Sequence, residues 1–141
     1  MSKINLARVL LGGLLAGLVI NVGELILNGM VLASEWAEFL EQLGLDPTFS
    51  APQLVAGAVT TFIYGIVLVW IYAAIRPRFG PGPRTALIAG LTLWVLAYVL
   101  FTASLLAGGM FSARLMVVTI IWGAFEAPLA GIVGAWVYLE D

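Results

Sequence analysis

Four stretches of the chain, each more than 20 residues long, consist almost entirely of apolar side chains. They run from about Leu6 to Leu32, Gln53 to Ile75, Thr85 to Ala107 and Ala113 to Leu139. A helix needs about 20 mainly apolar residues to cross the hydrocarbon core of a bilayer. The second and third stretches carry no charged residue. The sequence therefore predicts an all-α integral membrane protein, a four-helix bundle that forms a single transmembrane domain over residues 1–141.

The scarcity of charged residues supports this prediction. Charged side chains make up 10% of the chain and hydrophobic ones 62%, whereas a soluble domain carries about 25% charged residues. The chain has no cysteine and no histidine, which removes thiolate metal sites, cysteine nucleophiles and the commonest general base. Its 6 basic residues are too few for a surface that follows a phosphate backbone. We expect a non-enzymatic protein with no cofactor, no metal site and no nucleic-acid partner.

The basic residues lie in particular connections between the apolar stretches. Lys3 and Arg8 stand at the start of the first stretch, and Arg76, Arg78 and Arg84 follow the second, in a Pro- and Gly-rich segment expected to break the helix. The connection between the first two stretches is acidic. Because short Lys- and Arg-rich loops stay in the cytoplasm, we expect both termini inside (N-in, C-in). The three arginines of the second connection are expected to meet lipid headgroups.

The acidic outer connection has the pattern of a short amphipathic helix. Apolar residues recur at i, i+3, i+4 and i+7 from Trp36 to Leu43, and acidic residues occupy the opposite face. Ser34 is expected to cap the start of this helix, and Gly44 to end it. We expect it to lie in the outer membrane interface, with Trp36 at headgroup depth. The alternative is a lid over the bundle.

The first apolar stretch carries a stripe of small and polar residues on one helix face. Gly13, Gly17, Asn21, Glu24 and Asn28 follow one another at steps of four, four, three and four residues, which places them above one another on a helix. The two glycines let a second helix approach closely. The Asn–Glu–Asn part requires polar partners or water. The stripe is therefore predicted to face the interior of the bundle.

A second carboxylate, Glu126, lies in the fourth stretch at a depth similar to that of Glu24. A rise of about 1.5 Å per residue places both in the middle-to-outer part of the membrane. Small residues on the same helix, Gly123, Gly131 and Gly134, are expected to pack closely against a neighbour. Further candidates for a ligand- or proton-binding cluster at this level are Thr60, Thr61, Tyr64, Tyr98 and Thr102.

The sequence places no lysine or arginine at the depth of these carboxylates. An ionised carboxylate at the bilayer centre costs about 2.5–3.5 kcal/mol. We therefore expect at least one of Glu24 and Glu126 to be protonated at neutral pH, or a cation to lie between them. Three roles remain open: hydrogen bonds that join helices, a site for a ligand or ion, and a docking contact for another membrane subunit.

Two pairs of segments are similar within the chain. Gly65–Tyr72 matches Gly131–Tyr138, and Arg8–Met30 matches Arg84–Met110. The repeated unit is a two-helix hairpin in a constant orientation. Such a duplication predicts a pseudo-two-fold axis along the membrane normal.

The layout resembles small bacterial four-span membrane proteins that belong to families of unknown function. The resemblance rests on an N-terminal span, a short Trp-containing outer helix that ends at Leu43-Gly44, three further spans, and the closing run Gly131-Ile132-Val133-Gly134-Ala135-Trp136. It implies a multi-pass protein of the bacterial cytoplasmic (inner) membrane, and it implies no activity. Small multidrug-resistance exporters also carry a glutamate in their first helix, but the second glutamate and the acidic outer connection distinguish this chain from them.

The leading hypothesis is a small non-enzymatic membrane protein, a homo-oligomer or an accessory subunit of a larger complex, whose buried Glu/Asn cluster joins helices. The alternative is a small proton-coupled transporter, or a membrane protein that binds a polar or cationic ligand. In that case Glu24 and Glu126 carry the proton or hold the ligand.

Overall fold

The computed structural model describes residues 3–138 and contains four helices that are long and apolar enough to cross a membrane. They run over Leu6–Val31, Ala51–Phe79, Pro83–Ala107 and Ala113–Val137. This confirms the all-helical fold with four apolar spans. The second span extends further at both ends than predicted. Leu139, the predicted end of the fourth span, lies outside the described residues.

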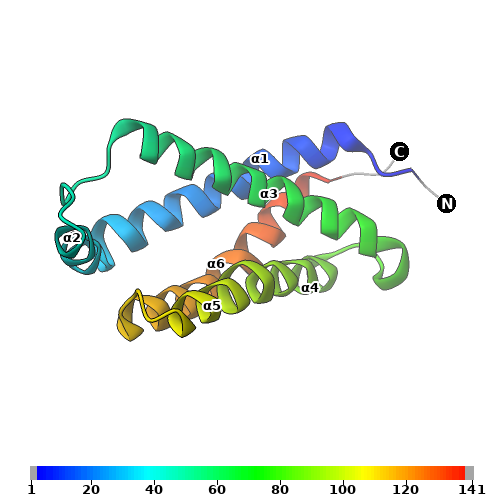
Figure 1. Ribbon diagram of the computed structural model, residues 1–141. Coiled ribbons are helices and arrows are strands. Elements are labelled where there is room, and N and C mark those ends of the chain that lie inside the picture. The colour runs from blue at the N-terminus through cyan, green and yellow to red at the C-terminus, as the bar shows by residue number, and fades with distance from the viewer. Residues whose placement is uncertain (1–2, 139–141) are drawn as a thin grey trace.

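Two of the four spans change helix type along their length. In chain order the elements are α1 (Leu6–Ile26), η1 (Leu27–Val31), α2 (Ala33–Gln42), α3 (Ala51–Phe79), α4 (Pro83–Leu93), η2 (Trp94–Leu100), α5 (Phe101–Ala107) and α6 (Ala113–Val137). The segments η1 and η2 are π-helical. Figure 1 shows that α1 crosses α3, that α4 and α5 lie below this pair, and that α6 starts beside α5 and rises to the crossing; α2 lies at the end opposite the chain termini. We call these ends the α2 end and the termini end.

Local sequence signals set two of the helix boundaries, and the one at Gly44 was predicted. The backbone N–H of Ser50 donates to Gln53 Oε1 at 2.8 Å, which is half of a capping box at the start of α3. At the other end of the same connection, Gly44 has φ +70°. The N–H groups of Gly44 and Leu45 donate to the carbonyls of Glu41 and Leu40, each at 2.9 Å. This is the Schellman motif that ends a helix at a left-handed glycine.

The predicted cap at the start of α2 is wrong. Ser34 lies inside the helix, and its hydroxyl donates to Glu35 Oε2 at 2.9 Å. The N-cap position belongs to Leu32, with φ −113° and ψ 15°. The reason is that the first span continues through η1 to Val31, so a single residue separates it from α2. A polar cap would need a longer break in the helix.

The Arg-rich segment is also more helical than predicted. Arg76 and Arg78 lie in the last turn of α3, and Arg84 lies in the first turn of α4. Pro77 removes one backbone donor from α3, but the helix ends only at Gly80, with φ +83°. Glycine adopts this conformation without a steric penalty. Only residues 80–82 connect α3 and α4.

Glycines lie where the helices approach most closely. A Cβ atom added at Gly65 of α3 would lie 2.3 Å from the Gly13 carbonyl oxygen and 2.3 Å from the Gly17 nitrogen, both in α1. On α6, a Cβ atom at Gly131 or Gly134 would lie 2.9 Å from a backbone carbonyl oxygen of α4 or α1, respectively. The predicted packing glycines 13, 17, 131 and 134 therefore all lie against a neighbouring helix.

Two tyrosines at equivalent positions in the predicted repeats make equivalent contacts. The rings of Tyr72 and Tyr138 meet edge to face, with centroids 5.9 Å apart. The Tyr72 hydroxyl accepts from the N–H of Gly82, directly before α4, and the Tyr138 hydroxyl accepts from the N–H of Asn5, directly before α1, each at 3.2 Å. Figure 1 shows that α1 and α4 run in the same direction. This reciprocal contact is what a pseudo-two-fold axis predicts, and it supports the duplication.

Two apolar cores lie one above the other along the bundle. The core near the termini end includes Ile20, Leu93 and Ala130. The core near the α2 end includes Leu27 and Met116. On the first span Glu24 falls between Ile20 and Leu27, and on the fourth span Glu126 falls between Met116 and Ala130. The two carboxylates thus occupy the level that separates the cores.

Candidate functional site

Tyr98 of η2 joins the two carboxylates of the predicted cluster. Its hydroxyl lies 2.5 Å from Glu126 Oε2 on α6 and 3.4 Å from Glu24 Oε1 on α1. The side chains of Tyr98 and Glu126 are buried, with exposed fractions of 5% and 6%. One hydroxyl therefore links three different spans at a single level of the membrane.

Small residues make room for this arrangement. A Cβ atom at Gly123 of α6 would lie 2.2 Å from Tyr98 Cδ1, so the tyrosine ring lies flat against the glycine. A Cβ atom at Gly23 of α1 would lie 1.7 Å from Glu126 Oε1. Gly123 was predicted to receive a neighbouring helix and instead receives an aromatic ring. Gly23 was not among the predicted site residues.

A tryptophan on α6 completes the environment of Glu126. The indole nitrogen of Trp122 donates to Glu126 Oε1 at 3.1 Å. Both oxygens of the carboxylate thus have a donor, as is usual for buried polar groups. Trp122 lies four residues before Glu126, a spacing that brings two side chains together on a helix. Trp122 was not predicted as a site residue, although this spacing is visible in the sequence.

Asn28 extends the cluster towards the α2 end. Its amide nitrogen donates to Glu24 Oε2 at 2.6 Å and to the Glu24 carbonyl oxygen at 3.1 Å. The Asn28 amide oxygen accepts from the indole nitrogen of Trp36 at 2.8 Å. A chain of polar contacts therefore runs from the buried Glu126, through Tyr98, Glu24 and Asn28, to the first turn of α2.

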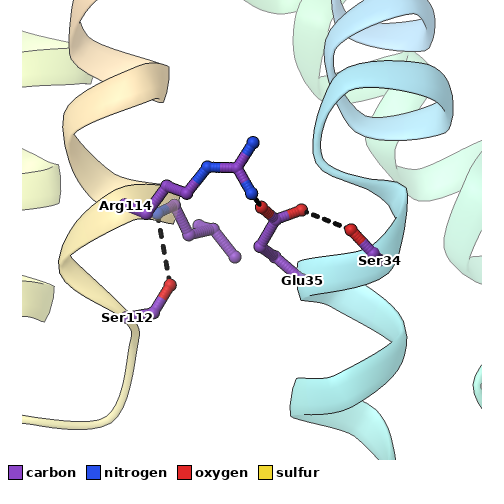
Figure 2. Close-up of polar contacts among 5 residues, drawn as sticks. Ser34, Glu35, Ser112 and Arg114 are labelled. Carbon is purple, nitrogen blue, oxygen red and sulfur yellow. Dashed lines mark hydrogen bonds and ion pairs between the residues drawn. The ribbon is translucent and has the colours of Figure 1, made fainter.

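Further contacts hold α2 against the bundle. The Trp36 ring packs edge to face against Phe49 and Phe111, and Phe39 stacks on Phe111 with centroids 4.6 Å apart. Glu35 forms an ion pair with Arg114 at the start of α6, as Figure 2 shows. The Arg114 side chain is 67% exposed, whereas that of Glu35 is 10% exposed, so the pair lies at the edge of the contact between α2 and α6. The indole of Trp36 is thus occupied by protein groups, and α2 is held against the bundle.

Replacing Trp36 by phenylalanine is expected to loosen α2 and leave the spans intact. The ring contacts remain, while the hydrogen bond to Asn28 is lost, at a cost of about 1 kcal/mol. Amide hydrogen exchange in detergent should rise in residues 33–42 and stay unchanged in α3. Arg114→Gln serves as the comparison, because it removes another contact of α2, the ion pair with Glu35, and leaves the Trp36–Asn28 hydrogen bond in place. Equal protection of α2 in the wild type and in Trp36→Phe would contradict the expected coupling.

Several predicted candidates lie outside this chain of contacts. The hydroxyls of Thr60 and Thr61 donate to carbonyls of their own helix, those of Ala56 and Ala58, each at 2.8 Å. Tyr64 packs against the core near the termini end. The structure therefore does not bring these three residues of α3 to the carboxylates. The part of α3 near the α2 end diverges from α5 and α6, as Figure 1 shows, which depth in the sequence did not reveal.

Asn21 also lies outside this chain of contacts. The Asn21 amide nitrogen donates to the Gly17 carbonyl at 2.9 Å and approaches the Ala58 carbonyl of α3 at 3.4 Å. It therefore lies between α1 and α3 and makes no hydrogen bond to either carboxylate. Thr102 is buried in α5, with an exposed fraction of 3%, one helical turn beyond Tyr98.

The two carboxylates of the cluster offer more acceptor oxygens than there are hydrogen-bond donors around them. Its four carboxylate oxygens face three donor groups: the Tyr98 hydroxyl, the Trp122 indole and the Asn28 amide. Among residues 3–138, no lysine or arginine pairs with Glu24 or Glu126, and no group of three His, Cys, Asp or Glu is placed to hold a metal ion. The Tyr98 hydroxyl has one hydrogen to donate. One added proton on Glu24 Oε1 would give every oxygen a partner.

Comparisons with family models, with curated proteins and with solved structures found no match to this chain.

Proposed function

We propose that this chain is a small non-enzymatic protein of a bacterial inner membrane, oriented N-in and C-in, whose buried Glu–Tyr–Glu cluster joins its helices. The protein acts as a homo-oligomer or as an accessory subunit of a larger membrane complex. The single observation that carries the proposal is the Tyr98 hydroxyl, which reaches carboxylates on two other spans.

The pairing of the cluster supports a joining role. Glu126 is buried, and each of its oxygens accepts a hydrogen bond. Polar side chains that bond across helices stabilise membrane proteins by about 0.6 kcal/mol per contact on average. The contacts to Glu126 come from η2 and α6, and those to Glu24 from η1 and η2. Together they connect the two hairpins of the duplicated fold at the level between the two cores.

The surface of α3 supports the proposal of a further membrane partner. In its most apolar 18-residue window, 17% of the residues are buried, against 33–39% for the other three spans. Residues 51–57 are all exposed, and a Cβ atom added at Gly57 would have nothing within 4 Å. A helix face that presents small residues is suited to close approach by another helix.

Purification in a mild detergent tests the assembly directly. The mass of the protein–detergent complex, measured by light scattering, should exceed that of one chain. Mass spectrometry should identify either only this chain or one constant partner. A monodisperse single chain without a co-purifying protein would contradict the proposal and favour a protein that works alone.

A second candidate function is proton coupling, and the π-helical segments are the observation that favours it. Well under 1% of residues in proteins are π-helical, and such turns often occur at functional sites. Here Asn28 lies in η1 and Tyr98 lies in η2. Both irregular segments thus coincide with the carboxylate cluster. In this alternative, Glu24 and Glu126 exchange a proton through Tyr98 during transport or ligand binding.

Replacing Glu24 by glutamine separates the two candidates. Glutamine keeps an oxygen for Asn28 and supplies an N–H that can donate to Tyr98, so a purely joining cluster should lose less than about 1 kcal/mol of stability. Infrared spectra of the wild type in bilayers should then show a protonated carboxyl band that stays constant across the physiological pH range.

Proton coupling has a different signature in the same experiment. The wild-type carboxyl band would appear and disappear within the physiological pH range, and Glu24→Gln would abolish this change without unfolding the protein. Two carboxylates that stay ionised at neutral pH would contradict both candidates, because both rest on a shared proton.

A further inference from the structure

The hydrogen bonds of Asn28 connect the carboxylate cluster to α2, which lies outside the four spans. The Asn28 amide oxygen accepts from the Trp36 indole at 2.8 Å. Its amide nitrogen donates to Glu24 Oε2 at 2.6 Å and to the Glu24 carbonyl oxygen at 3.1 Å. An indole N–H can only donate. The docked Trp36 therefore fixes the orientation of the Asn28 amide, with its nitrogen towards Glu24.

This orientation restricts where the two carboxylates can carry a proton. Because Glu24 Oε2 accepts from the Asn28 amide, a proton on Glu24 belongs on Oε1, which faces the Tyr98 hydroxyl. Glu126 Oε1 accepts from the Trp122 indole, so a proton on Glu126 belongs on Oε2, which also faces Tyr98. While α2 is docked, both carboxylates can therefore be protonated only on the side of one hydroxyl.

The cluster has a hydrogen-bond partner for one proton but not for two. With one proton, the Tyr98 hydroxyl accepts from the protonated carboxyl and donates to the other carboxylate. Among residues 3–138, this hydroxyl is hydrogen-bonded only to Glu24 and Glu126. With two protons it would accept from both carboxyls, and its own hydrogen would have no acceptor. A second proton therefore breaks the pairing of donors and acceptors somewhere in the cluster.

The α2 end of the cluster is where this break costs least. Tyr98 is buried, and Trp122 lies inside the apolar span of α6, so a donor without an acceptor at either residue would stay within the membrane. A proton on Glu24 Oε2 instead makes the Asn28 amide turn, and its nitrogen then faces the Trp36 indole, donor against donor. Trp36 lies in the first turn of α2, where a released indole can bond water or headgroups.

We propose that α2 is a latch, which is docked while the cluster holds one proton and is released when Glu24 and Glu126 are both protonated. The inference rests on the proposed cluster with its shared proton, and it adds a regulation to that cluster. Release takes up one proton from water, so it is favoured as the pH falls below the physiological range. The ratio of released to docked protein should rise by at most about tenfold per pH unit. The total change should be about 5- to 150-fold, the effect of one buried donor without an acceptor.

Other acidic groups near α2 also titrate as the pH falls. From the neighbouring spans, Tyr98 and Glu126 are the titratable groups that face Glu24, and residues 51–63 of α3 include none. On α2, Glu35 pairs with Arg114 of α6, and protonation of Glu35 would break this pair. The remaining acidic side chains of residues 33–46 are exposed: Glu38, Glu41 and Asp46. Arg114→Gln is the matched control, because it removes the influence of Glu35 and leaves the cluster unchanged.

Distances between spin labels measure the docking of α2 directly. The chain has no cysteine, so one label is placed by Glu41→Cys on α2 and the other by Leu106→Cys on α5, both at exposed positions. Double electron–electron resonance in lipid nanodiscs, from neutral pH down to about pH 4, should show the docked distance replaced by a broader distribution. The distance between labels at Leu10→Cys and Leu106→Cys should stay constant, because the spans remain folded.

Glutamine mimics a protonated carboxyl at every pH, since it has one donor and one acceptor group. Glu24→Gln and Glu126→Gln each stand for one proton, and α2 should stay docked at neutral pH in either variant. The double variant stands for two protons, so α2 should be released at neutral pH and should not respond further to acid. Arg114→Gln should keep the pH-dependent release. Loss of that release in Arg114→Gln, or a folded double variant with α2 docked, would overturn the proposal.

A further variant does not depend on the double variant folding. In Trp36→Phe, combined with Arg114→Gln, the Asn28 amide can turn without facing a second donor. The distance to α2 should then be broad at neutral pH and independent of pH. A pH dependence equal to that of Arg114→Gln alone would contradict the latch.

Failure of the latch can be told apart from failure of the proposed cluster. A protonated carboxyl band at neutral pH, together with an α2 distance that does not change with pH, contradicts the latch alone. The absence of any protonated carboxyl band at neutral pH contradicts the shared proton, and with it both proposals.

Discussion

Replacing Gly65 by alanine is expected to destabilise the bundle by about 3 kcal/mol, the upper range for overpacking a well-packed site. The added methyl group would meet the Gly13 carbonyl oxygen and the Gly17 nitrogen at 2.3 Å, and the Gly17 Cα at 2.6 Å. These are backbone atoms of α1, so no side-chain rotation can relieve the contact. Either α1 and α3 must separate, or both must shift along each other. Separation would also disturb Ile20 and Leu68 in the adjacent core.

Gly57→Ala is the matched control on the same helix. A Cβ atom at Gly57 would have nothing within 4 Å, and alanine is the better helix former by about 1 kcal/mol. Reversible unfolding at one chain per micelle, with increasing dodecyl sulfate and followed by circular dichroism, measures both variants without the proposed partner contact at Gly57. Gly65→Ala should unfold at a clearly lower dodecyl sulfate fraction than the wild type, and Gly57→Ala at the same or a higher fraction. Similar midpoints for both variants would show that the crossing tolerates a methyl group.

Gly23→Ala is expected to dislodge the carboxylate of Glu126 and to cost about 2–3 kcal/mol, because hydrogen bonds to charged groups are worth about 1.5–3 kcal/mol each. The new methyl group would lie 1.7 Å from Glu126 Oε1. Unlike the backbone at Gly65, the glutamate side chain can move. Moving it removes the carboxylate from Trp122 and Tyr98, which leaves buried donors without an acceptor.

A double-mutant cycle isolates this mechanism. Glu126→Ala should itself be destabilising, since Tyr98 and Trp122 lose their acceptor. In that background, adding Gly23→Ala should cost almost nothing, because the group that it displaces is already gone. The coupling energy should therefore be about 2 kcal/mol, within the range of about 0.5–3 kcal/mol found for residues in contact. Additive effects would mean that alanine at position 23 acts on another part of the structure.

Gly29→Ala provides the control for the cycle. Gly29 also lies in the first span, close to the cluster in sequence, but a Cβ atom there would have nothing within 4 Å. It should show neither destabilisation nor coupling to Glu126. The same unfolding assay serves all of these variants, so the detergent and the denaturant are the same in every comparison.

The parts of the site that follow from local spacing were predictable. Glu24 and Asn28 stand four residues apart on one helix, and their side chains are hydrogen-bonded at 2.6 Å. Tyr98 was a candidate by depth alone, and its hydroxyl lies 2.5 Å from Glu126. Thr60 and Thr61 were predicted to join the cluster from their depth in the membrane, and they do not. Depth specifies a level in the membrane but not the direction in which each helix leans away from the others.

The site residues that were not predicted depend on contacts between separate elements of the fold. The hydrogen bond from the Trp36 indole to Asn28 was not predicted, because it depends on how α2 folds back against the end of the first span. Gly23 has no distinguishing local pattern, and its importance follows only from the carboxylate of Glu126, on another span, that lies against it. The π-helical segments were equally hidden, since their apolar sequences read as ordinary α-helix.

Sequence alone was enough for the four spans, the all-helical class, the ends of the α2–α3 connection and the stripe that carries Glu24. The reason is that hydrophobic length, capping spacing and glycine conformation act over a few residues. The meeting of Glu24 and Glu126 at Tyr98 and the contact of α2 with the bundle depend on how whole helices cross. Those crossings are set by backbone approach at glycines such as Gly65, a property of pairs of helices that neither helix reveals by itself.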